Sequence, residues 1–120
     1  MNNPGKTMKP ETLFAGVAVS DFETAKQWYE RFFDRRADVV AHDTEVMWQT
    51  TANGWLYIAR DLDHAGHSLI AIAVPNIADA LSALRGRGIE SGPIERQSEN
   101  AVKAVVTDPD GNSIGIIEAH

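Results

Sequence analysis

The feature that most constrains this chain is an internal repeat. A stretch of roughly 20 residues that begins at Phe14 matches the pattern of a second stretch that begins at Leu69, at a constant offset of 55 residues, the difference between 69 and 14. Each copy opens with residues that alternate between two faces, as in a strand, and continues with apolar residues at helical spacing. The repeat therefore predicts one strand–helix unit that is used twice.

Three short strand signals follow each expected helix. They span 38–42, 45–50 and 55–60 in the first half, and 93–97, 101–107 and 113–118 in the second. Asn53-Gly54 is typical of a hairpin turn, and in the DPDGN run at 108–112 the aspartate side chains are expected to hold a tight turn. The sequence therefore predicts an α+β fold of tandem βαβββ modules, which form a curved mixed sheet cleft with the helices outside.

The same pattern sets the expected boundaries. Residues 1–12 are polar and carry two prolines, and we predict that they form a flexible tail. A single domain is expected over 13–120, with modules at 13–61 and 67–119.

The ends of the two helices also leave signals. Ser20 with Glu23 matches a capping box for the first helix, and Asp21 is the alternative cap. Asn76 is the expected cap of the second helix, which Gly86 can end.

Composition excludes several classes of function. The chain has 120 residues and a formal net charge of −6, which argues against binding to nucleic acid or to an anionic membrane surface and favours a cationic guest. It has no cysteine, so disulfides, thiolate catalysis and cysteine-based zinc sites are excluded. No apolar run is long enough to span a membrane, and the first residues lack the apolar core of a signal peptide. We expect a cytoplasmic protein.

Two motifs carry a family resemblance. The segment VSDFETAKQWYERFF, at 19–33, belongs to the opening strand and helix of the first βαβββ unit, and DPDGN, at 108–112, comes just before the closing strand of the second. In this combination the chain resembles the vicinal oxygen chelate superfamily, which includes glyoxalase I, fosfomycin-resistance enzymes, extradiol dioxygenases and bleomycin-resistance proteins. The resemblance covers about residues 13–119. It implies a ligand cleft on the concave sheet face, where metal-dependent members hold a divalent ion with two histidines and a glutamate.

The resemblance places those three ligands on Phe14, Leu69 and Gly115 of this chain. None of these side chains offers a nitrogen or oxygen atom, whereas divalent ions require several such ligands. The resemblance therefore implies no metal and no other cofactor at this site. Glu118 falls on the opposite face of the last strand from Gly115. An unusual metal site that uses His64, His67 or His120 stays open.

Strand alternation sorts the side chains that should face the cleft. The expected ligand-binding residues are Phe14, Gly16, Trp48, Trp55, Tyr57, Leu69, Lys103, Val105 and Gly115. Met47 competes with Trp48 for its place on this face. Two other interpretations stay open: the small residues allow close packing between modules, and the aromatic residues cover a dimer contact.

Three functions fit these features. The first is a metal-free binding protein that sequesters an aromatic or amphipathic compound, with a cationic one favoured by charge, as in bleomycin-type drug resistance. The alternative is a metal-independent or atypical enzyme of the lyase or isomerase type, with Lys103, Tyr57 or Glu45 as acid or base; the catalytic residues are unknown, and whether the protein is an enzyme stays open. The third is a structural or regulatory module. The expected partners are a small-molecule ligand and a second copy in a homodimer, because sheet edges require cover.

Overall fold

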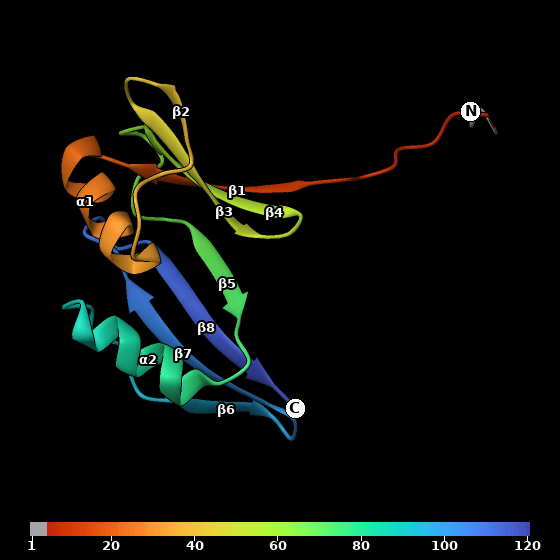
Figure 1. The fold of residues 1–120 in the computed structure, drawn as a ribbon, viewed down its shortest axis with the longest axis vertical. Coiled ribbons are helices and arrows are strands. Elements are labelled where there is room, and N and C mark those ends of the chain that lie inside the picture. Colours follow the sequence, from red (N-terminus) through yellow and green to blue (C-terminus); the bar gives the residue numbers. More distant parts are fainter. Residues whose placement is uncertain (1–4) are drawn as a thin grey trace.

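The computed structural model describes residues 5–120, which contain eight strands and two helices (Figure 1). In chain order the elements are β1 (Leu13–Val19), α1 (Phe22–Phe33), β2 (Val39–His42), β3 (Glu45–Thr51), β4 (Gly54–Arg60), β5 (Leu69–Ala73), α2 (Ile77–Gly86), β6 (Glu95–Ser98), β7 (Ala101–Thr107) and β8 (Ser113–Ala119). Residues 5–12 carry neither helix nor strand, and the remainder of the predicted tail, residues 1–4, lies outside the described residues. Neither helix in the described range is long and apolar enough to cross a bilayer.

The strands form two four-stranded mixed sheets, in the orders β1-β4-β3-β2 and β5-β8-β7-β6. In each sheet the first strand of the module pairs parallel with the last one, and the other neighbours pair antiparallel. This confirms the predicted α+β fold of tandem βαβββ modules. The predicted ends of every strand agree with the structure to within two residues. The largest difference is at the start of β6, because Pro93 has no N–H to donate to a strand ladder.

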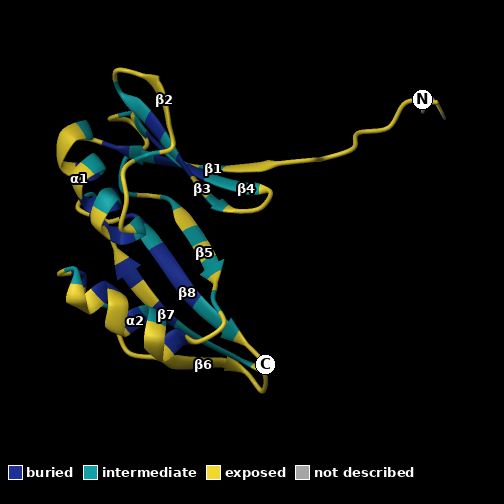
Figure 2. Cartoon of the chain, viewed as in Figure 1, coloured by how far each residue is buried: buried dark blue, intermediate teal, exposed yellow. Residues whose placement is uncertain are grey.

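The core forms between each helix and the sheet face that it covers. Val17 and Val19 of β1 and Ile114 and Ile116 of β8 are almost completely buried, as alternation predicts. Figure 2 shows this buried layer in dark blue along β7 and β8, whereas β2 and β6, each at one edge of its sheet, are exposed throughout. Each module therefore has one sheet face packed on a helix and one face left bare.

The helix termini follow their capping residues. Asp21, not Ser20, is the N-cap of α1: its carboxylate accepts a hydrogen bond from the Thr24 N–H at 3.1 Å, and this bond lowers the pKa of Asp21. Ser20 is engaged elsewhere, because its main-chain N–H and its hydroxyl both donate to the Asp110 carboxylate. Asn76 caps α2 as predicted, accepting from the Asp79 N–H at 2.9 Å, and the helix ends at Gly86.

The turn at 108–112 is held by Asp108. This buried carboxylate accepts from the main-chain N–H groups of Asp110 and Asn112, each at 2.9 Å. Gly111 has a φ of +96°, which a residue with a side chain rarely adopts. The prediction that aspartate side chains hold the turn is confirmed for Asp108, whereas the Asp110 carboxylate accepts from Ser20 of the first module instead.

Hydrogen bonds from the same turn also join the second module to the first. The Tyr29 hydroxyl on α1 donates to Asp108 at 2.8 Å, and the Asn112 amide donates to the Ala18 carbonyl at the end of β1 at 3.0 Å. Burial, together with the Asp108 carboxylate, raises the pKa of the Tyr29 phenol far above its usual range, so that it remains a neutral donor. A second link is Arg87, whose guanidinium donates to the main-chain carbonyls at the end of α1.

Candidate functional site

The bare face of the first sheet is aromatic. Phe14 on β1 and Trp55 on β4 are register partners, and their rings stack with centroids 6.2 Å apart. Tyr57 lies opposite Gly16 and covers it, since a Cβ added at Gly16 would lie 2.5 Å from the phenol ring and its hydroxyl. Four of the predicted ligand-binding residues therefore lie together on one surface of the first module.

The bare face of the second sheet is apolar apart from one cation. Leu69, Lys103, Val105 and Gly115 line a hollow of about 180 Å³, as the sequence predicts, together with Ile70, Ala71 and Ser113. The Lys103 side chain lies across Gly115, because a Cβ added there would be 2.6 Å from its Cε and 3.4 Å from its Nζ. Ser113 is the residue of this face that sequence reasoning missed, although alternation from Gly115 points to it.

Trp48 does not belong to either bare face, so the prediction that it faces the cleft is wrong. It is 0% exposed, its ring stacks on Phe33 at 5.3 Å, and its indole N–H donates to the Arg35 carbonyl at 3.1 Å. Met47 takes the cleft side instead and is the register partner of Tyr57.

A register shift in the β3–β4 hairpin explains this difference. Thr51 pairs with Gly54, and a regular hairpin continued from that pair would place Trp48 opposite Tyr57 on the bare face. The shift between Gln49 and Thr51 instead places Trp48 opposite Leu56, which belongs to the core. One extra residue in a strand moves every later side chain to the other face.

The hollow that holds Lys103 is lined only by residues of the second module within the described chain. A hollow of about 230 Å³ between the modules is lined from the first sheet by Leu13, Ala15 and Leu56, which alternate with Phe14, and also by Trp55 of the bare face. Residues 70–73 line it from the second module. The described residues form no hydrogen-bonded ladder between the two sheets. Leu69 and Gly115 thus share a hollow, but Phe14 does not reach it within one chain, contrary to the expectation that the three positions converge.

The residues at these positions do not fit the divalent ion that the family resemblance implies. The side chains of Phe14, Leu69 and Gly115 have no nitrogen or oxygen atom that could bind a metal. Tyr57 is the residue of the first sheet that corresponds to Gly115 in the second, and it offers a single phenol oxygen. Within residues 5–120, no three His, Asp or Glu side chains gather in a way that could hold a metal.

The histidines and acids considered as alternatives have local roles. His64 is paired with Asp61 at 2.8 Å, and this hydrogen bond lowers the pKa of the Asp61 carboxyl. Glu118 accepts a hydrogen bond at 2.7 Å from the Ile77 N–H at the start of α2 and is 3.1 Å from His120. Glu118 thus supports a helix from the side of the sheet that faces away from Gly115.

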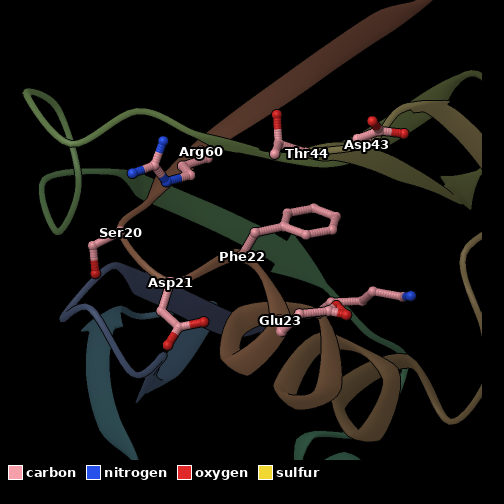
Figure 3. A pocket seen from close by; sticks show the side chains of 8 residues that line it. Ser20, Asp21, Phe22, Glu23, Asp43, Thr44 and Arg60 are labelled. Atoms are coloured by element: carbon pink, nitrogen blue, oxygen red, sulfur yellow. The ribbon is translucent and has the colours of Figure 1, made fainter.

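A further hollow, of about 560 Å³, lies beside the start of α1. Figure 3 shows side chains around it from the end of β1, the first turn of α1, the β2–β3 turn and the end of β4, among them Phe22, Thr44 and Arg60. Acidic and basic groups are mixed here. Asp21 and Ser20 are already committed to a helix cap and to the turn at 108–112, so this hollow has less free binding capacity than its size suggests.

Comparison with known proteins agrees with the fold. A glyoxalase/bleomycin resistance protein from Catenulispora acidiphila DSM 44928 has 35% sequence identity and a TM-score of 0.84, covering 91% of this chain and 98% of its own. TnmS3, an antibiotic binding protein from Streptomyces sp. CB03234, has 19% identity and a TM-score of 0.77, covering 96% and 100%. An integron cassette protein from the mobile metagenome of a Halifax Harbour sewage outfall has 18% identity and a TM-score of 0.74, covering 89% and 97%.

The last two likenesses concern the fold alone. A search among curated proteins found no significant match. A family model for the Glyoxalase/Bleomycin resistance protein/Dioxygenase superfamily matches residues 12–116, almost the whole region of repeated modules. The match confirms the resemblance read from the two motifs, and the chain belongs to this superfamily, the vicinal oxygen chelate proteins.

Proposed function

We propose that this protein binds a small aromatic or amphipathic compound on its bare sheet faces, without a metal, and holds it chemically unchanged. The observation that carries the proposal is the aromatic surface of the first module. Phe14 is 51% exposed although its ring is stacked on Trp55, and Tyr57 lies beside them. Flat rings held by their neighbours are suited to stacking on a planar ligand and lose little conformational entropy when they do so.

The chemistry at the family's ligand positions supports binding over catalysis. A hydrocarbon side chain or none at all stands at Phe14, Leu69 and Gly115, so the usual Lewis acid of the family has no ligands there. The relative TnmS3 is described as an antibiotic binding protein. We extend that kind of role, sequestration of a compound, to this chain as part of the proposal.

We further propose that a homodimer completes the cleft. The outer edges of β1 and β5 have no strand partner among the described residues, and Leu13 and Leu69 on them are 73% and 85% exposed. Unpaired edges with exposed apolar side chains are surfaces that another chain can cover. A second copy that places its second module opposite the first module of its partner would bring the aromatic face and the Lys103 hollow together.

Ligand screening tests the binding proposal. Aromatic compounds that bind should raise the melting temperature, and mass spectrometry should recover them unchanged with or without a chelator. Trp55→Leu should weaken binding by about tenfold, because the free energy of stacking on one ring corresponds to about that change in the dissociation constant. Phe22→Leu, outside the bare faces, should not weaken it. Recovery of a chemically altered compound would instead favour the enzyme alternative. A screen in which no aromatic compound shifts the transition would refute the proposal.

Light scattering after size-exclusion chromatography tests the assembly. The wild-type chain should elute with twice its own mass. Leu13→Asp should reduce it to a monomer, because a charge at a covered edge opposes pairing. A monomeric wild-type protein at the concentrations used for binding would contradict the dimer but would leave the bound compound to be tested separately.

A further inference from the structure

Gly115 is required by its neighbour and not by its own backbone. It lies in the middle of β8, between Ala71 of β5 and Val105 of β7, and it is not among the glycines with a positive φ. A larger residue would meet the Lys103 side chain, whose Cε lies 2.6 Å from the place of a Cβ. The glycine thus makes room for a lysine to cross the face at the point where the family resemblance puts a metal-binding glutamate.

The ammonium of Lys103 forms no ion pair within the described chain. Lys103 is half-buried, and none of the ion pairs within residues 5–120 includes it. Glu95, its register partner on β6, lines a second hollow of about 160 Å³ together with Lys103, but the two side chains form no ion pair within 4.0 Å. Of the other residues that line the hollow of about 180 Å³, Ser113 alone has a polar side chain.

A cation in such surroundings is suited to hold an anion. Transferring an ammonium from water to apolar surroundings is costly unless a negative group offsets its charge, and the attraction between the two strengthens as water is excluded. The net charge of −6 on the whole chain acts at longer range and is screened by salt over about 8 Å. The local ammonium therefore outweighs the overall acidity in selecting the polar group of a ligand.

We propose that Lys103 is the anion-binding group of the cleft, and that the ligand is an aromatic compound that carries a carboxylate or an acidic phenol or enol oxygen. The inference rests on the proposed binding function, and on the proposed homodimer that brings the two faces together, and deepens it. One sheet face supplies the stacking rings, and the other supplies a fixed positive charge in place of a metal ion. A cationic guest, which the overall charge favours in the sequence, is disfavoured at this position.

Three matched probes test the proposal by calorimetry with the full-length chain: 2-naphthoate, 2-naphthylmethanol and 2-naphthylmethylammonium. They share a ring system and differ in charge. The wild-type protein should bind the naphthoate about tenfold or more tightly than the neutral alcohol, and the ammonium compound most weakly, as expected for a charge-assisted hydrogen bond. Lys103→Met should bring the ratio of the first two dissociation constants to about one, and Lys103→Glu should reverse the order.

Two further variants separate a local effect from overall charge and from folding. Lys26→Met removes one positive charge from α1, away from the bare faces, and should leave the ratio as in the wild type. Gly115→Ala changes no charge but displaces the Lys103 side chain, so it should lower the ratio several-fold. The melting temperature of each variant, measured without ligand, reports on folding.

The outcomes distinguish this inference from the function on which it rests. Equal binding of all three probes that Lys103→Met leaves unchanged would overturn the role of Lys103 and leave aromatic binding intact. A preference for the ammonium probe would overturn it as well. Failure of all three probes to bind the wild-type protein would overturn both proposals.

Discussion

Replacing Asn112 with alanine should strongly destabilise the fold, although the DPDGN pattern around it is typical of a turn on the surface. Its side chain is 0% exposed and makes three hydrogen bonds: its amide donates to the Ala18 carbonyl at 3.0 Å and to Asp108 at 2.8 Å, and its oxygen accepts from the Ser68 N–H at 2.9 Å. Asp108 retains Tyr29 as a donor in the variant. The Ala18 carbonyl and the Ser68 N–H lose their partners.

The size of the effect follows from these two groups. A buried main-chain group without a partner costs roughly 1–3 kcal/mol. Both lie in half-buried residues, so about 1.5 kcal/mol each is reasonable, for a total of about 3 kcal/mol. At about 4 °C per kcal/mol for a chain of this size, the melting temperature should fall by about 12 °C.

Denaturant unfolding followed by tryptophan fluorescence and circular dichroism measures the loss. Trp28 belongs to α1 and Trp48 packs against Tyr29 of the same helix, so these two buried residues report on the first module, to which Asn112 is bonded from the second. Asn100→Ala is the matched control, because Asn100 is exposed in the β6–β7 turn and should change the stability by no more than about 0.5 kcal/mol. If Asn112→Ala were as stable as this control, the idea that the turn joins the two modules would be refuted.

Two other predictions concern Trp48 and Asp38. Trp48→Phe should lower the free energy of unfolding by about 1–3 kcal/mol, because the hydrogen bond to the Arg35 carbonyl and part of the packing on Phe33 are lost. The affinity for an aromatic probe, measured by calorimetry, should not change. A selective loss of affinity would place Trp48 in the site after all. The hydrogen bonds from Arg35 and from the Gln49 N–H lower the pKa of Asp38 below its ordinary 3.8, so the carboxylate stabilises the fold above that value and this contribution is lost as the pH falls below it. Acid titration followed by circular dichroism should therefore show a shallower loss of stability below about pH 4 for Asp38→Asn than for the wild type, and identical acid profiles would contradict the assignment.

The sequence alone was sufficient for the architecture and for the sheet face on which several candidate residues lie. The period-2 alternation, the helical spacing and the 55-residue offset are local or repeated signals, so β1, α1 and their counterparts β5 and α2 could be predicted without any knowledge of contacts. The same alternation placed Phe14, Tyr57 and Gly115 on bare faces, and the motifs at 19–33 and 108–112 led to the correct family.

Only the tertiary structure decided the features that depend on pairing between residues distant in the sequence. The shift in the β3–β4 ladder put Trp48 into the core, because the register of a hairpin, and not the residue type, determines which face a side chain occupies. The hydrogen bond from Tyr29 to Asp108, 79 residues away in the chain, and the absence of Phe14 from the hollow that Leu69 and Gly115 line arise from the packing of one module on the other. The need for glycine at 115 became visible only with Lys103 lying across it, since no local pattern records which side chain occupies the space above a strand.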